Sequence, residues 1–116
     1  MTKGQFATIA LTTFLVIGTG WFAPSIAEEP ATIEVTLKGH QFAPAEIHVP
    51  TGRPVILRIT NQDDTVEEFD STALQVEKVI VGGHYGLVRL RPLGPGRYSF
   101  MGEYHADTAK GVVVSE

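Results

Sequence analysis

The stretch YSFMGEYHADTAKG, from Tyr98 to Gly111, contains the strongest signals for how this chain folds. It opens with an aromatic run in which Tyr98 and Phe100 stand two residues apart. It continues into a compact polar segment around His105 and ends in Lys-Gly before a run of valines. Side chains two residues apart lie on the same face of a β-strand. The stretch therefore predicts two strands joined by a tight loop that carries a histidine.

The remainder of the chain shows the same period of two. In TIEVTLKG (residues 32–39) the apolar residues alternate with Glu, Thr and Lys, and PVILRIT (54–60), LQVEKVIV (74–81) and GLVRLR (86–91) are also typical of strands. Clusters of Gly, Pro, Asn and Asp separate these runs and mark turns. About seven short strands at this spacing predict an all-β, Greek-key β-sandwich.

The first residues have a different composition. Lys3 precedes an almost uncharged, largely apolar run (residues 6–23), and Ser25 and Ala27 are small residues that suit positions −3 and −1 of a cleavage site. This arrangement is typical of a secretory signal peptide. We therefore expect a signal peptide over residues 1–27 and a periplasmic location for the domain that follows.

An uncleaved membrane anchor is the alternative for this segment. A span needs about 20 apolar residues, and this run is shorter and is interrupted by Gly18 and Gly20. Cleavage is favoured, and it leaves a domain over residues 28–116 with no membrane span.

The predicted domain is acidic and contains no cysteine. All 13 acidic residues and 8 of the 9 basic ones lie after residue 27, which gives a formal charge of −5. Without a basic patch, nucleic-acid binding is not expected. Without cysteine there is no disulfide, so the hydrophobic core, with or without a bound metal, must stabilise the fold.

His105 is the strongest candidate for a ligand among the four histidines. Glu103 and Asp107 lie two residues to either side of it, in a loop that strands hold at both ends. Carboxylate oxygen and imidazole nitrogen together suit iron, copper(II), manganese or zinc. The loop therefore predicts a metal site, whereas an isolated histidine elsewhere is better interpreted as surface.

A second acidic segment, DDTVEEFDS (residues 63–71), contains Glu67 and Glu68. By composition alone it is a solvated turn. It contributes to a metal site only if folding brings it against the loop of His105. Successive residues of a strand point to opposite faces, so only one of the two glutamates can easily face that loop. Patterns for nucleophilic catalysis are absent, because no serine stands in a Gly-x-Ser-x-Gly elbow, and an enzyme is not the favoured interpretation.

Four stretches of the chain resemble the cupredoxin superfamily. They are HQFAPAEIHVPTGRPVILRITNQD (40–63), EEFDS (67–71), LGPGRYSF (93–100) and HADTAKGVVV (105–114), in the family's order and spacing. The resemblance implies a cupredoxin-like sandwich. A type 1 blue-copper site uses one histidine from a first ligand strand and then Cys, His and Met from the C-terminal loop.

Only one of those four ligands has a counterpart here. By position, Glu67 stands at the first histidine, Gly102 at the cysteine, His105 at the loop histidine and Ala109 near the methionine. Without a thiolate, ordinary blue-copper electron transfer is not expected.

The chain is more similar to the EfeO-type cupredoxin-like domains, which are periplasmic modules associated with bacterial iron uptake. That resemblance implies copper(II) or iron as the bound ion, an inner-membrane iron permease as partner, and a ligand set drawn from carboxylates and the loop histidine. The candidate metal ligands are Glu67, Glu68, Glu103, His105 and Asp107. Two alternatives stay open: a metal-free cupredoxin scaffold that docks on a membrane partner, and a component that oxidises ferrous iron.

Overall fold

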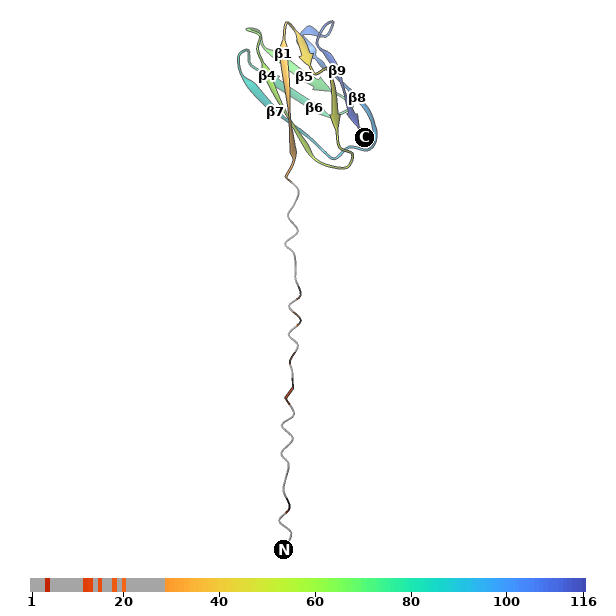
Figure 1. Cartoon of the computed structure of the whole chain (residues 1–116). Helices are drawn as coiled ribbons and strands as arrows, with labels where there is room; N and C mark the ends of the chain where they lie inside the picture. The colour runs from red at the N-terminus through yellow and green to blue at the C-terminus, as the bar shows by residue number, and fades with distance from the viewer. Residues whose placement is uncertain (1–3, 5–11, 14, 16–17, 19, 21–28) are drawn as a thin grey trace.

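The computed structural model describes residues 29–116 continuously, together with residues 4, 12–13, 15, 18 and 20 (Figure 1). The predicted signal peptide and its cleavage after Ala27 fall almost wholly outside these residues. Among the residues that the structure describes, no helix is both long enough and apolar enough to cross a membrane.

Nine strands and one short helical turn make up the described domain. They are β1 (Ala31–Lys38), β2 (Gln41–Ala43), β3 (Glu46–Val49), β4 (Val55–Asn61), β5 (Glu67–Ser71), β6 (Val76–Ile80), β7 (Tyr85–Leu90), β8 (Gly96–Gly102), the 3₁₀ turn η1 (Glu103–His105) and β9 (Lys110–Ser115). The sequence predicted about seven strands. The structure adds the short strands β2 and β3 on either side of Pro44, which the predicted strand runs did not include.

The strands form two packed sheets, which confirms the predicted β-sandwich. One sheet has the order β2-β1-β4-β7 and the other β3-β9-β8-β5-β6. The pairs β1–β4 and β3–β9 are parallel, and the other pairs are antiparallel. β2 and β3 therefore belong to different sheets although they are neighbours in sequence.

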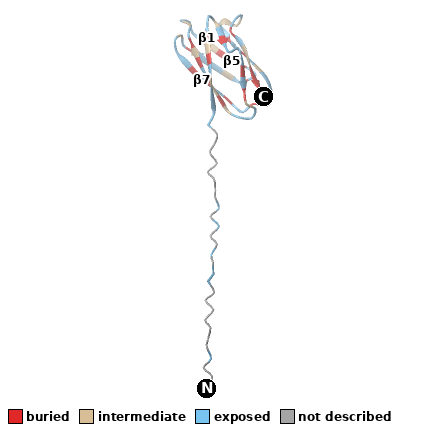
Figure 2. Cartoon of the chain, viewed as in Figure 1, coloured by how far each residue is buried: buried red, intermediate tan, exposed pale blue. Residues whose placement is uncertain are grey.

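The core lies between the two sheets and follows from the alternation in the sequence. Buried positions alternate with exposed or half-buried residues along β3, β4, β5 and β7, whereas the last three residues of β9 are all buried (Figure 2). At the centre, Phe42 of β2 meets Phe69 of β5 edge-on at 5.9 Å and Phe100 of β8 at 5.2 Å between ring centroids. Phe69 and Phe100 stack at 4.8 Å. These rings hold β2, β5 and β8 together below the loops that form the candidate site.

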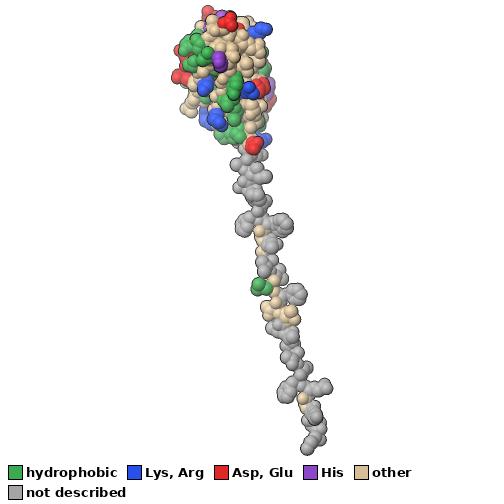
Figure 3. All heavy atoms as spheres, turned by 90° about the vertical axis from the view of Figure 1, so that its left-hand side faces the viewer, with side chains coloured by type: hydrophobic (Ala, Val, Ile, Leu, Met, Phe, Trp, Pro, Cys, Tyr) green, Lys and Arg blue, Asp and Glu red, His purple; other side chains and the backbone are tan. Residues whose placement is uncertain are grey.

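The outer face around β7 has a different character from the acidic loops. Viewed from that side, hydrophobic side chains lie beside Lys and Arg (Figure 3). The Tyr85 side chain is exposed, and the Arg58 guanidinium lies 4.2 Å from the centroid of its ring. Hydrophobic, basic and acidic side chains therefore all occur on this face of the domain.

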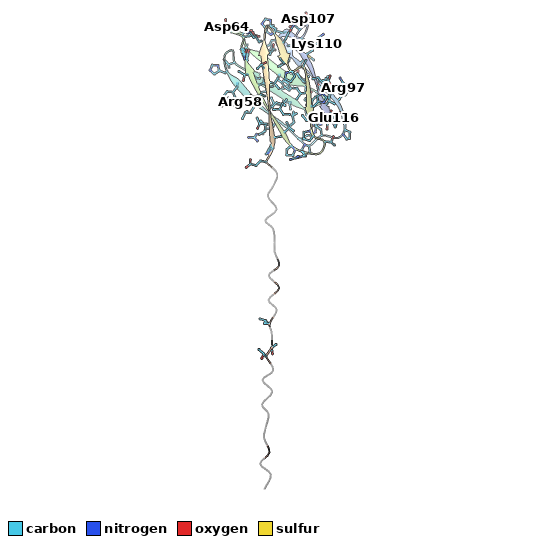
Figure 4. The ribbon with its side chains drawn as sticks, in the orientation of Figure 1. Arg58, Asp64, Arg97, Asp107, Lys110 and Glu116 are labelled. Atoms are coloured by element: carbon cyan, nitrogen blue, oxygen red, sulfur yellow. The ribbon has the colours of Figure 1, made fainter. Side chains whose placement is uncertain are left out.

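The loops of interest gather at one end of the sandwich. Asp64, in the β4–β5 loop, and Asp107, in the η1–β9 loop, lie at the same end, whereas Glu116 lies toward the other (Figure 4). The register of β5 against β8, in which Phe69 pairs with Gly102, brings Glu67 level with the start of η1.

Candidate metal centre

Glu67 is a buried glutamate at the centre of the candidate site, with 1% of its surface exposed. Its Oε1 accepts hydrogen bonds from the backbone N–H of Glu68 at 3.0 Å and of Tyr104 at 2.9 Å. Its Oε2 lies 2.5 Å from Nδ1 of His105. The acidic strand and the histidine loop therefore meet in space, as the sequence required for a shared site, and Glu67 is the glutamate that faces inward.

Gly102 provides the room for this carboxylate. A Cβ atom at residue 102 would lie 2.6 Å from Cδ and 2.8 Å from Oε2 of Glu67, and 2.8 Å from Cβ of Ala109. Heavy atoms this close overlap, so a side chain at residue 102 cannot coexist with the present position of Glu67. The glutamate carboxylate thus takes up space beside residue 102, where the resemblance placed a cysteine.

A type 1 copper centre does not fit these residues. Gly102 and Ala109 offer no donor atoms, Glu67 stands in place of the first histidine, and its carboxylate holds Nδ1 of His105. The arrangement lacks the thiolate that such a centre needs. We therefore assign no blue-copper electron transfer to this chain.

His105 ends η1 and presents its two ring nitrogens differently. An ionised carboxylate can only accept, so the contact with Glu67 places a proton on Nδ1. Nε2 makes no hydrogen bond to any described residue. Every buried side-chain N or O atom among the described residues does have a hydrogen-bond partner. Nε2 is therefore not buried but faces solvent, in keeping with the 25% exposure of the side chain. A neutral His105 in this state offers the Nε2 lone pair outward.

His40 stacks on the ring of His105. The ring centroids are 3.6 Å apart and the ring planes differ by 14°. The backbone N–H groups of Gly39 and His40 donate to the two carboxylate oxygens of Asp63 at 2.7 and 2.9 Å. The hydrogen bond from His40, and then that from Gly39, lowers the pKa of Asp63. The sequence did not place His40 in the site, because a histidine far from the loop of His105 was interpreted as a surface residue.

Glu68 points away from Glu67 and belongs to a separate acidic group on the outer face. Its negative charge raises the pKa of Glu103, and a hydrogen bond between the two carboxyl groups adds to the effect. Asp70 and Glu77 contribute further negative charge to Glu103. Partial desolvation, followed by the charge of Glu68, raises the pKa of the Tyr104 hydroxyl. Carboxyl groups this close repel one another unless a proton or another cation lies between them.

The structure divides the five predicted ligands into two pairs and one separate residue. Glu67 is with His105, Glu68 is with Glu103, and Asp107 is exposed and has no hydrogen bond or ion pair with the described residues. Within the described part of the chain, no three His, Asp or Glu side chains are arranged so that they could together hold a metal ion. The single pocket expected from the sequence is not present in this conformation.

The family model of the cupredoxin-like domain matches residues 7–115, so this chain belongs to the cupredoxin-like domain family. An uncharacterized protein of Rickettsia prowazekii (strain Madrid E) is 39% identical over 82 residues, which is 71% of this chain. The match spans 66% of that relative, slightly less than two thirds of its length.

Solved structures agree with the fold. Auracyanin A, a "blue" copper protein from Chloroflexus aurantiacus, has a TM-score of 0.63 at 17% identity and covers 76% of this chain and 100% of its own. The metal-binding domain of the Cu(I)-exporting P-type ATPase CopA of Streptococcus pneumoniae D39 has a TM-score of 0.63 at 17% identity, covering 73% of this chain and 84% of its own. At these identities the likeness concerns the fold alone.

Proposed function

We propose that this protein binds copper(II) or iron through Nε2 of His105, on the side of the ring that faces away from Glu67. The observation that carries the proposal is the buried Glu67 carboxylate, which lies 2.5 Å from Nδ1 of the same ring. Histidines that bind metals commonly donate their other ring N–H to a carboxylate, which fixes the tautomer and makes the free nitrogen more basic. In this proposal Glu67 orients the ligand and is not itself a ligand.

The acidic group beside the histidine supplies the second part of the argument. Mutual repulsion between Glu68 and Glu103 raises the pKa of Glu103, and a bound cation would relieve that repulsion just as a proton does. Carboxylate oxygen with one imidazole nitrogen favours copper(II) or iron over the softer copper(I). Because no complete set of donors is arranged in the described structure, the proposal requires that Glu103 or Asp107 moves toward His105 when the ion binds.

The cellular setting that we propose is the bacterial periplasm, with a role in iron uptake and an inner-membrane iron permease as partner. The support is the signal-like pattern of residues 1–27 and the resemblance to EfeO-type domains. Copper has further support in the membership of the cupredoxin-like family, and in the solved structures of similar fold that are described as copper proteins.

The test is metal uptake by the purified protein. The protein is dialysed against copper(II), iron(III) and zinc in separate experiments, and bound metal is measured per chain. We expect stoichiometric uptake of copper(II) or iron(III), and a nitrogen signal from the ligand in the electron paramagnetic resonance spectrum of the copper form. His105→Ala should weaken copper(II) binding at least about tenfold, or about 1.4 kcal/mol.

The matched control is His48→Ala. His48 is a half-exposed histidine bridged to Glu46 and Glu116, and it stands outside the loops of the candidate site. Its removal should leave copper affinity unchanged. If His48→Ala and His105→Ala weaken binding equally, the site lies elsewhere.

A metal-free docking module is the second candidate function. The observation that favours it is the filled space beside Gly102, where the Glu67 carboxylate takes the room of a cysteine side chain. On this alternative the Glu67–His105 pair only fastens the loop. The absence of stoichiometric uptake of all three ions would favour it over metal binding.

A further inference from the structure

His40 adopts a left-handed backbone conformation, which glycine adopts most readily and which Asn, Asp and His adopt more often than other residues. Its φ is +56°, and Gly39 before it has a φ of +61°. These two residues form the loop between β1 and β2, because Lys38 pairs with Gln41 on either side of them. Positive φ at both central residues is the requirement of a type I′ hairpin turn, for which glycine suits the second position best. A left-handed conformation costs a non-glycine residue about 1–2 kcal/mol.

The turn alone does not explain a histidine at this position, because glycine would form the same turn without strain. Three contacts hold the strained turn in place. The Asp63 carboxylate accepts the N–H groups of Gly39 and His40, and the N–H of Asp63 donates to Oδ1 of Asn61 at 3.0 Å. Asn61 is fully buried and is fixed in turn by hydrogen bonds to the carbonyls of Thr65 and Ile80. The turn is therefore anchored to the core through the end of β4.

This anchoring fixes the position of the His40 ring. His40 lies parallel to His105 with 3.6 Å between centroids, and its Nε2 is 3.3 Å from Oγ1 of Thr65. The His105 ring is thus held from two directions, by Glu67 at its Nδ1 edge and by His40 on one face. A ring held in this way cannot turn over without breaking both contacts.

We propose that His40 is a positioning residue for His105. It keeps the His105 ring in the orientation that directs Nδ1 at Glu67 and Nε2 at solvent, and it acts through its flat ring and not as a ligand. The effect of His40 on metal affinity rests on the proposed function, whereas its effect on the orientation of the ring does not.

The experiment uses variants of residue 40 that separate the effect of the His40 ring from the effect of the backbone turn. His40→Gly and His40→Asn both accept a left-handed backbone and remove the stack. His40→Phe keeps an aromatic ring but has no nitrogen donor. Nitrogen NMR of the His105 ring reports its tautomer and the hydrogen bond at Nδ1, and titration with copper(II) reports affinity. Thermal unfolding checks that each variant folds.

In wild type we expect a single His105 tautomer with the proton on Nδ1. His40→Gly and His40→Asn should give mixed tautomers and about fivefold weaker copper(II) binding, since an aromatic stack contributes about 1 kcal/mol. His40→Gly should unfold at the same or a higher temperature than wild type, because it removes the backbone strain. His40→Phe, where it folds, should restore the single tautomer and the affinity.

The opposite results overturn the inference. An unchanged His105 spectrum in both His40→Gly and His40→Asn would show that His40 does not position the ring. A loss of copper affinity in His40→Phe as large as that in His40→Gly would make His40 a ligand. If wild type binds no copper(II), the proposed function fails, and the NMR comparison still decides whether His40 positions His105.

Discussion

Removing the buried carboxylate of Glu67 is the most demanding test of the site. Glu67→Ala deletes an acceptor that serves three donors, namely the N–H groups of Glu68 and Tyr104 and Nδ1 of His105. The side chain is 1% exposed, so water cannot replace the lost contacts without opening the loop. We expect a large loss of stability from one substitution on a short strand.

The size of the loss follows from the number of donors left without a partner. A hydrogen bond to a charged group contributes about 1.5–3 kcal/mol net, and such contributions do not simply add. Leaving one buried donor without a partner costs about 1–3 kcal/mol, and because Glu67→Ala leaves three donors we expect a loss of about 3 kcal/mol or more. A domain of this size loses about 4–8 °C in melting temperature per kcal/mol, so the midpoint should fall by at least about 12 °C.

The neighbouring glutamate is the matched control. Glu68 follows Glu67 directly on β5, but its side chain faces the outer acidic group and repels Glu103. Glu68→Ala should therefore leave stability unchanged or raise it slightly at neutral pH. Urea unfolding followed by circular dichroism gives both free energies of unfolding. Equal losses in the two variants would refute the view that Glu67 is the inward carboxylate that fastens the loop.

Glu67→Gln separates structure from chemistry at the same position. The amide oxygen can still accept the two backbone N–H groups, but its NH₂ group can only donate toward His105. Nδ1 must then be the acceptor, and the proton moves to Nε2. We expect a smaller loss of stability than in Glu67→Ala, together with a loss of copper binding. Retained copper affinity with an unchanged His105 tautomer would refute this role of Glu67.

Three further outcomes follow from the same contacts. Asp63→Asn should lower stability by about 1 kcal/mol at pH 7; since the folded pKa of Asp63 is lowered, this difference from wild type in urea unfolding should start to shrink near the ordinary value of 3.8 and vanish only once pH has fallen through the lower folded pKa. Glu103→Gln should raise the melting temperature slightly at pH 7; since the folded pKa of Glu103 is raised, the gain should grow as pH rises above 4.5 and be absent below it. Gly102→Cys should not give the intense visible absorption of a copper–thiolate bond and should lower the melting temperature, because its Cβ would meet Glu67; the same change should lower the melting temperature less when it is made in a Glu67→Gly variant and compared with that variant.

Much of the fold could be predicted from the sequence, because the alternation of apolar and polar residues reports directly which face of a strand is buried. Strand β1 and strand β7 are examples in which each inward side chain is apolar or small. Strand β5 does not follow this code. Its buried residues are Glu67, Phe69 and Ser71, so two of the three inward positions are polar and the pattern predicts neither face.

The site was harder to predict because it depends on contacts between distant segments. The choice between Glu67 and Glu68 is set by the pairing of Phe69 with Gly102, which the sequence around the two glutamates does not specify. The part played by His40 depends on a turn that packs against a loop 65 positions later in the chain. No local pattern in the sequence encodes such a contact.

Glu67 and Gly102 have to be understood as one structural unit. A buried glutamate is stable at residue 67 only if the opposite strand leaves space and the loop supplies donors, and Gly102, Tyr104 and His105 meet both conditions. Conversely, a cysteine at residue 102 would need that space for its own side chain. The Glu67 carboxylate in its present position and a cysteine side chain at residue 102 therefore exclude each other in this chain. Replacing the glycine alone cannot convert one into the other, because the carboxylate that fills the space is itself held by three hydrogen bonds.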